Sequence, residues 1–152
     1  MSEWKISGFT LVPFCGDDAY EIAIHPDMGI YKNEFFDAWV QVRCCGGGWT
    51  AYKEDVGILW CGGITPVWYG VGNAWFIRST WVENFPIATV KMCKAVLERL
   101  IDEEHYHRVQ CEVRKSSTTD IRFALFLGFT VEGIMRKWGA DGSDYLLMSR
   151  VQ

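Results

Sequence analysis

The segment that most restricts the fold is a predicted amphipathic helix set between two short strands. From residue 86 to about residue 104, apolar residues recur at steps of three and four, namely Ile87, Val90, Cys93, Val96, Leu97, Leu100 and Ile101. Pro86 suits the first turn of a helix, and Asn84 just before it is a residue type that caps helices. Segments 73–79 and 108–114 flank the helix and have strand-like patterns. A strand-helix-strand crossover is right-handed and joins parallel strands, so both strands should belong to one sheet.

The other predicted elements turn this crossover into a larger sheet. Runs rich in Val, Ile, Trp and Tyr, separated by turns that contain Gly and Asp, predict an antiparallel meander before the helix. In chain order, the elements from the meander onward are strands near 49–53, 56–64 and 73–79, the crossover helix, a strand at 108–114, a helix at 119–127, and strands near 129–137 and 144–150.

The N-terminal third has a less regular pattern. It predicts a strand at 5–12, a short helix at 17–24 that Pro26 ends, and a helix at 33–42 that the glycines at 46–48 terminate. Together, the elements predict an α/β (α+β) protein with a mixed, mostly antiparallel sheet and helices on both faces. No repeat or linker interrupts the pattern, so one domain over residues 1–152 is expected.

Charge and cysteine spacing exclude several classes of function. The formal net charge is -4, and the Lys and Arg residues are scattered, which argues against nucleic-acid binding. The apolar runs are far shorter than the ~20 residues of a membrane span, and the first residues have no apolar signal region. A cytoplasmic protein is therefore expected. The six cysteines include no C-x-x-C pair, so no metal site is expected.

The C-terminal part carries a recognisable pattern. The stretch IRFALFLGFTVEGIMRK leads from a helix through Gly128-Phe129 and a strand to Glu132-Gly133, and the last strand ends Met148-Ser149-Arg150. With the order of elements, this resembles the GNAT superfamily of acyl-CoA-dependent N-acetyltransferases over roughly residues 49–151. The stretches AWFIRST and DIRF give a weaker likeness to GNAT-like proteins encoded by bacteriophages, including those of the internal virion protein A type.

The resemblance implies a site for acetyl-CoA. In that superfamily the fourth strand splays from the fifth in a V, and backbone groups of the fourth strand bond the pantetheine arm like an added strand. The pyrophosphate lies at the start of the following helix, where free N–H groups and the helix dipole favour an anion. The matching positions are Phe76, Ile77 and Ser79 on the strand, Phe85, Ile87, Ala88 and Thr89 at the helix start, and Arg122 as a candidate for the nucleotide phosphates.

Two departures from the family pattern bear on catalysis. The phosphate loop of the family contains glycine, whereas no glycine lies between Ser79 and Thr89 here. The family's frequent tyrosine, which can protonate the leaving thiolate, falls at Ala124, and its frequent asparagine falls at Ser117. Ser117 is kept as a candidate catalytic residue. An alanine donates no proton, so a general acid would have to come from elsewhere or from solvent.

Acidic residues and one cysteine remain as candidates for the chemistry. Glu83 and Glu54 could each deprotonate an amine through water, or could simply be solvated loop charges. Cys111 lies mid-strand next to the implied slot and could carry the acyl group, although no base is evident beside it.

Two functions are compatible with these observations. The first is an acetyl-CoA-dependent N-acetyltransferase that acts on an amine of a small molecule or protein by direct transfer. The second is an inactive GNAT-like binding protein that, if encoded by a phage, would be directed at a host protein in the host cytoplasm. The lost glycines, Ala124 and the large share of aromatic residues favour the second. The acceptor and the oligomeric state are left open by the sequence.

Overall fold

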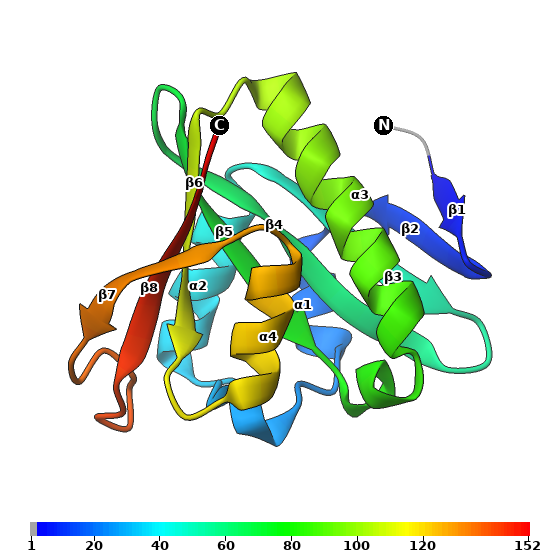
Figure 1. Cartoon of the computed structure of the whole chain (residues 1–152). Helices are drawn as coiled ribbons and strands as arrows, with labels where there is room; N and C mark the ends of the chain where they lie inside the picture. Colours follow the sequence, from blue (N-terminus) through cyan, green and yellow to red (C-terminus); the bar gives the residue numbers. More distant parts are fainter. Residues whose placement is uncertain (1–2) are drawn as a thin grey trace.

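The computed structural model describes residues 3–152, which form an eight-stranded sheet flanked by helices (Figure 1). The strands are β1 (Trp4–Ile6), β2 (Phe9–Pro13), β3 (Gly47–Lys53), β4 (Gly57–Trp68), β5 (Val71–Arg78), β6 (Arg108–Arg114), β7 (Thr130–Met135) and β8 (Tyr145–Val151). The α-helices are α1 (Gly16–Glu21), α2 (Glu34–Arg43), α3 (Pro86–Glu104) and α4 (Thr118–Phe126), and short 3-10 turns cover η1 (Pro26–Met28) and η2 (Thr80–Asn84).

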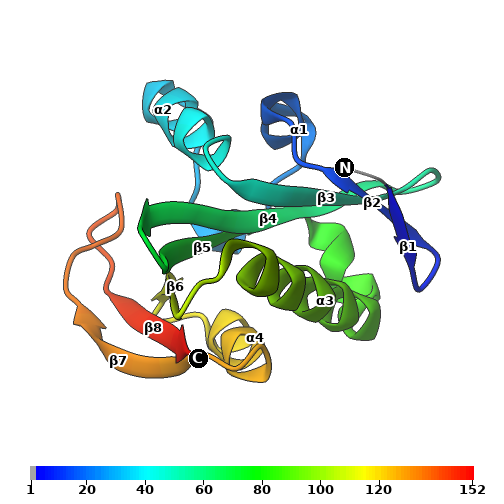
Figure 2. The ribbon, with the colours of Figure 1, turned by 90° about the horizontal axis from the view of Figure 1, so that it is seen from above.

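The sheet is mixed and mostly antiparallel, as the sequence predicts. Its strands lie in the order β1-β2-β3-β4-β5-β6-β8-β7. Neighbours pair antiparallel except β5 and β6, which are parallel and are connected through η2 and α3. Helices α1 and α2 cover one face of the sheet, and α3 and α4 cover the other (Figure 2). The prediction of helices on both faces is therefore confirmed.

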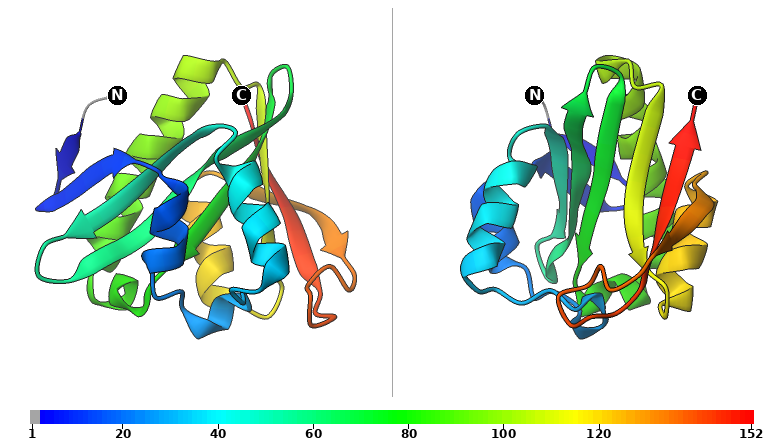
Figure 3. Two further views of the ribbon diagram at one scale, coloured as in Figure 1. Left: turned by 180° about the vertical axis from the view of Figure 1, so that it is seen from behind. Right: turned by 90° about the vertical axis from the view of Figure 1, so that its left-hand side faces the viewer.

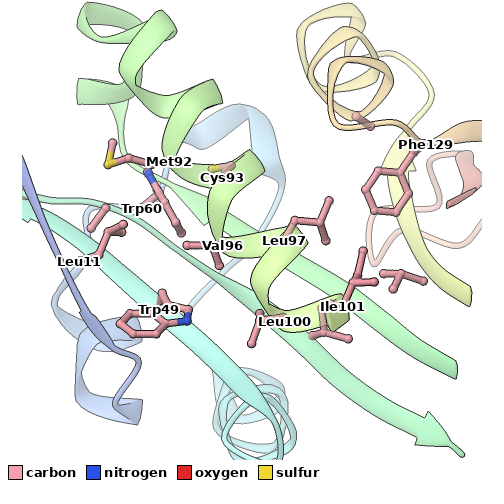
Figure 4. Packing of buried hydrophobic residues seen from close by; sticks show 14 of the residues in the cluster. Leu11, Trp49, Trp60, Met92, Cys93, Val96, Leu97, Leu100, Ile101 and Phe129 are labelled. Atoms are coloured by element: carbon pink, nitrogen blue, oxygen red, sulfur yellow. The ribbon is translucent and has the colours of Figure 1, made fainter. Parts of the chain in front are cut away.

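The main core lies beneath α3. The apolar stripe of this helix buries Met92, Cys93, Val96, Leu97, Leu100 and Ile101. They pack against a sheet face that carries Leu11, Trp49 and Trp60 (Figure 4). Each fully buried side chain of this size contributes about 1.5–3 kcal/mol of transfer free energy. The packing of this stripe therefore fixes α3 on the sheet and places its N-terminus beside the end of β5.

A smaller core holds α1 and α2 on the opposite face. Asn33 caps α2 by accepting hydrogen bonds from the backbone N–H groups of Phe35 and Phe36, at 3.1 and 3.3 Å. The helices bury Ala19, Ile22, Phe36 and Val40 against Cys61, Trp75 and Ile77 of β4 and β5. Because side chains alternate along a strand, Trp75 and Ile77 face α2, whereas Ala74 and Phe76 belong to the core under α3 and α4.

Several element boundaries differ from the prediction for identifiable reasons. The strand predicted at 5–12 is two strands, because Ser7 and Gly8 have positive φ (53° and 83°) and fold β1 back onto β2. This division adds one strand to the count. The predicted fourth and fifth strands, 73–79 and 108–114, between which the splay is expected, are therefore β5 and β6. The helix predicted at 17–24 ends at Glu21, and Ile24 forms an antiparallel bridge with Ser79.

The β4–β5 hairpin is longer than predicted. Strand β4 continues past Pro66, where a shift in register between Pro66 and Trp68 accommodates the residue that cannot donate to the ladder. The turn reverses at Gly70, which has a φ of 77°. This extension carries the aromatic residues Trp68 and Tyr69 out into solvent.

Candidate functional site

Strands β5 and β6 separate along their length. Their register covers three neighbouring pairs at their N-terminal ends: Val71 with Arg108, Gly72 with Val109, and Asn73 with Gln110. Beyond these pairs β5 continues to Arg78 beside β4, while β6 remains paired with β8. The right-hand panel of Figure 3 shows β5 (green) and β6 (yellow) diverging toward their C-terminal ends. A V-shaped splay, as the resemblance implies, is therefore present.

The edge of β5 that faces the splay is partly occupied. The N–H of Arg78 donates to Sδ of Met28 at 3.3 Å, and its C=O accepts from the N–H of His25 at 2.7 Å. Backbone groups of alternate residues share one edge of a strand, so Phe76 presents its N–H and C=O on the same edge, nearer the apex. The β5–β6 pairs end at Asn73, so within residues 3–152 no strand pairs with this edge at Phe76, and its backbone can bond a ligand within the splay.

A cavity of about 390 Å³ lies in the splay and reaches both faces of the sheet. On the α4 side it is lined by Ala74, Phe76, Cys111, Phe123 and Ala124. On the α2 side it is lined by Trp39, Arg43, Trp75, Glu112 and Tyr145. The splay thus connects an apolar half-cavity under α4 with a half-cavity under α2 that contains charged groups.

The α2 side holds two opposite charges. Cζ of Arg43 lies 4.9 Å from the ring centroid of Trp39, and its buried Nε has no hydrogen-bond partner within residues 3–152. Burial lowers the pKa of Arg43 from its ordinary value, and the nearby charge of Glu112 opposes that shift. Glu112 accepts a hydrogen bond of 3.3 Å from Nδ2 of Asn73. Among residues 3–152, no ion pair involves Arg43 or Glu112.

On the α4 side, two contacts cross from β5 to α4. The rings of Phe76 and Phe123 lie 5.1 Å apart. Arg78 forms a two-point ion pair with Asp120, with Nε–Oδ1 at 3.1 Å and Nη2–Oδ2 at 3.4 Å. Both partners are largely buried. The contacts join the wide end of the splay to the first turns of α4.

The N-terminus of α3 lies just beyond β5 and η2. Pro86 occupies the first turn, and Phe85 precedes it without a side-chain cap. The N–H of Thr89 donates to Phe85 O at 3.0 Å, while the N–H groups of Ile87 and Ala88 have no acceptor within the described part of the chain. Ile87 is 72% exposed, so these amides lie near solvent. They can accept an anion although the segment has no glycine.

The residues predicted for acetyl-CoA are divided between the splay, the core and the surface. Phe76 lines the cavity. Ile77 is fully buried on the α2 face and pairs with β4, and the buried Ser79 donates from both its N–H and its Oγ to Leu59 O. Of the residues at the helix start, Phe85 and Ala88 pack against the main core, and Thr89 donates from Oγ1 to Phe85 O. Arg122 is exposed on α4.

The predicted catalytic residues lie outside the cavity lining. Glu83 accepts a hydrogen bond of 2.7 Å from Nε2 of His25, and most of its side chain is exposed. Ser117 caps α4, since its Oγ accepts from the N–H of Asp120 at 3.2 Å. Its Oγ also donates to the Asp120 carboxylate at 2.9 Å, which helps to hold that carboxylate opposite Arg78. Glu54 is exposed in the β3–β4 turn.

Cys111 lines the cavity, but its environment opposes a nucleophilic role. Burial raises the pKa of the Cys111 thiol to about 12, and the neighbouring Glu112 charge adds to the shift. The thiolate is the reactive form of cysteine, so at neutral pH very little of it would form. All six cysteines are free. Within residues 3–152, no cluster of three or more His, Cys, Asp or Glu side chains is arranged to hold a metal ion.

Sequence reasoning missed Arg43 and Glu112, the two charges under α2. Glu112 carried a signal, since it is an acidic residue within the alternating strand RVQCEVR next to the implied slot. Arg43 carried none, because a basic residue in the last turn of a helix is an ordinary feature. Its approach to Glu112 depends on how α2 packs on the sheet.

Solved structures similar to this one support the assignment of the fold. Ribosomal-protein-S5-alanine acetyltransferase from Vibrio fischeri superposes with a TM-score of 0.73 at 12% identity, covering 99% of this chain and 97% of that one. A GNAT family acetyltransferase from Elizabethkingia anophelis with acetyl-CoA bound gives 0.71 at 16% identity, covering 96% and 99%. A GNAT family acetyltransferase from Bacillus anthracis gives 0.73 at 12% identity, covering 99% and 98%. This chain has the GNAT fold.

The GNAT fold extends over more of the chain than the likeness in sequence does. The pattern in the sequence covers residues 49–151, whereas the superpositions include α1 and α2 as well. No family model and no curated protein matches the sequence. Among the described residues, no helix has both the length and the apolar character that crossing a membrane requires.

Proposed function

We propose that this protein is an acetyl-CoA-dependent N-acetyltransferase that transfers the acetyl group directly to an amine. The observation that carries the proposal is the cavity in the β5–β6 splay, which opens to both sheet faces beside the free backbone of Phe76. A thioester arm entering from the α4 side and an amine entering from the α2 side would meet there. Bringing two reactants together in this way supplies much of the rate enhancement of direct transfer.

The residues present fit the pantetheine arm and the pyrophosphate of acetyl-CoA. The N–H and C=O of Phe76 would bond the arm as an added strand. The free N–H groups of Ile87 and Ala88 would hold the pyrophosphate, aided by the α3 dipole. Arg78 and Asp120 lie between these two places, so their ion pair would have to shift for the arm to pass. Acetyl-CoA supplies an acyl group activated as a thioester.

Glu112 is the general base in this proposal, in place of Glu83. It lies in the cavity on the side from which the amine would enter, and Asn73 orients it. Through a water molecule, Glu112 accepts the proton that the amine loses as the N–C bond forms and the C–S bond breaks. The thiolate takes its proton from solvent, because Ala124 donates none. Ser117 has a structural part in this proposal instead of a catalytic one, because it holds Asp120 opposite Arg78.

Ile87→Asp should weaken acetyl-CoA binding without damaging the fold. We expect wild-type protein to bind acetyl-CoA in calorimetry at roughly 100 µM or tighter, about -5.5 kcal/mol. A carboxylate in the first turn of α3 stabilises the helix but repels a pyrophosphate, and Ile87 is exposed, so little packing is lost. The dissociation constant of Ile87→Asp should rise about tenfold, which is about 1.4 kcal/mol.

Ile87→Asn is the matched control, because asparagine has nearly the same shape as aspartate but carries no charge. It should bind acetyl-CoA within about threefold of wild type, a difference of about 0.6 kcal/mol. If the Asp and Asn variants bound acetyl-CoA with equal affinity, the N-terminus of α3 would not be part of the binding site. An absence of heat and of a thermal shift at millimolar acetyl-CoA would remove the acetyltransferase proposal itself.

Asp120→Asn should lower stability and raise affinity for acetyl-CoA at the same time. The change leaves Arg78 buried without its partner charge, which should lower the free energy of unfolding by about 2–4 kcal/mol. The freed guanidinium would instead face the path of the anionic ligand, so the dissociation constant should fall. Thermal denaturation and calorimetry on the same samples measure both effects.

The double variant Arg78→Met/Asp120→Leu separates the two parts of this prediction. It removes both charges and should recover most of the lost stability, because an apolar pair of similar size often replaces a buried ion pair without cost. If Asp120→Asn were less stable but bound acetyl-CoA no better than wild type, the ion pair would not lie on the path of the arm.

A second candidate function is a binding protein that has lost transfer. Its support is the occupied edge at Arg78, together with the exposed Trp68 and Tyr69 at the tip of the β4–β5 hairpin, which are 71% and 93% exposed. The likeness to phage-encoded proteins, with a host protein as partner in the host cytoplasm, belongs to this candidate. Failure of acetyl-CoA to bind folded protein would favour it.

A further inference from the structure

The α2 half of the cavity is lined by a partly buried guanidinium, that of Arg43. Its Cζ lies 4.9 Å from the ring centroid of Trp39, and the ring of Trp39 lies 5.6 Å from the ring of Trp75. The guanidinium therefore rests on a packed aromatic cluster. Buried charges are usually paired, so this arginine points to an anionic group on a ligand.

Charge narrows the chemistry of that ligand. Arg43 is a cation without an ion pair among residues 3–152, and a guanidinium matches the two oxygens of a carboxylate. Glu112 lies on the same side of the cavity, near enough for its charge to act on Arg43, but forms no ion pair with it. The site therefore offers a cation and an anion, separated from each other, to one ligand.

We infer that the acceptor is an apolar α-amino acid, whose carboxylate binds Arg43 while its amino group lies against Glu112. The inference rests on the proposed function for the identity of the cavity as an acceptor site. The Trp39 and Trp138 rings and the Met28 and Ile30 side chains line the same cavity and suit an apolar side chain. A polyamine fits this half-cavity poorly, because Arg43 repels it.

Three compounds that differ only in their charged groups test the inference by binding alone. L-Phenylalanine, L-phenylalaninamide and 3-phenylpropionate share a ring but carry both charged groups, the ammonium alone and the carboxylate alone. Calorimetry of each, with and without saturating CoA, should give the tightest binding for L-phenylalanine and at least about tenfold weaker binding for the amide, equivalent to about 1.4 kcal/mol. Binding of spermidine should be weaker still.

Variants assign the effect to the residues named. Arg43→Gln should reduce binding of L-phenylalanine about tenfold or more and leave the amide unchanged. Arg136→Gln, which removes an exposed cation outside the cavity lining, is the control and should bind as wild type does. Circular dichroism and thermal denaturation confirm that each variant is folded before its affinity is compared.

The possible outcomes separate this inference from the proposed function. Loss of L-phenylalanine binding in Arg43→Gln supports the carboxylate subsite, even if acetyl-CoA fails to bind and the transferase proposal falls. Equal binding of the amino acid and its amide, unchanged binding in Arg43→Gln, or no binding of L-phenylalanine with or without CoA overturns the inference. Acetyl-CoA binding can persist in each of those cases, which would leave the transferase proposal standing with a different acceptor.

Discussion

Glu112→Gln should lower the rate of acetyl transfer at neutral pH by about 10²-fold or more, with little change in acetyl-CoA affinity. The substitution keeps the shape of the side chain and an oxygen that can accept from Asn73. It removes the group proposed to take the proton of the amine. The rate of CoA release, followed with a thiol reagent at saturating acetyl-CoA and a reactive amine, measures the effect.

The pH dependence distinguishes a lost base from a damaged site. The rate of Glu112→Gln should recover toward the wild-type rate as pH rises, because the amine then loses its proton to solvent. Glu83→Gln provides the comparison with the base predicted from sequence, and its carboxylate bonds His25 at 2.7 Å outside the cavity lining. A large fall in rate for Glu83→Gln with little change for Glu112→Gln would reverse the assignment.

Gly63→Ala should destabilise the protein severely. A Cβ at this position would lie 2.2 Å from the carbonyl oxygen of Gly47 and 2.7 Å from Cα of Gly48, which are backbone atoms of the neighbouring strand. Strands β3 and β4 would have to separate where the sheet supports both cores. We expect the free energy of unfolding to fall by about 3 kcal/mol or more. Urea denaturation measures it directly.

Gly133→Ala is the matched control within the same sheet. A Cβ at Gly133 in β7 would have no heavy atom within 4 Å, so the variant should unfold within about 0.5 kcal/mol of wild type. If Gly63→Ala were as stable as Gly133→Ala, the close approach of β3 and β4 would be wrong. The position of Trp75 beside Gly48, and with it the cavity wall, would then need revision.

The glycines at 46–48 stand out in the sequence, and the structure explains why glycine is present there. The sequence predicts that they end a helix, and α2 does end at Arg43. Gly47 and Gly48 then begin β3 instead of forming a loop. Gly47 leaves room for Leu100 of α3, and a Cβ there would lie 2.4 Å from that side chain. Sequence alone shows a run of glycines, but the neighbour that requires Gly47 to be glycine, Leu100, lies more than fifty residues away.

From residue 49 onward, the order of the helices and strands could be predicted from the sequence. The apolar stripe of α3 and the flanking strand patterns predict the parallel β5–β6 pair, because hydrophobic period and crossover handedness are local properties of the chain. The helix at 86–104 and the strand at 108–114 have the bounds that were predicted. The splay followed from the resemblance in sequence and is present.

The tertiary structure alone decided which side chains meet in the splay. Arg43 and Glu112 are sixty-nine positions apart, and they approach each other because the smaller core seats α2 on the sheet. Arg78 also depends on long-range contacts. Its side chain pairs with Asp120, and its backbone forms hydrogen bonds with His25 and Met28. Burial and charge at a site are sums over neighbours from the whole fold, whereas a sequence pattern reports only neighbours along the chain.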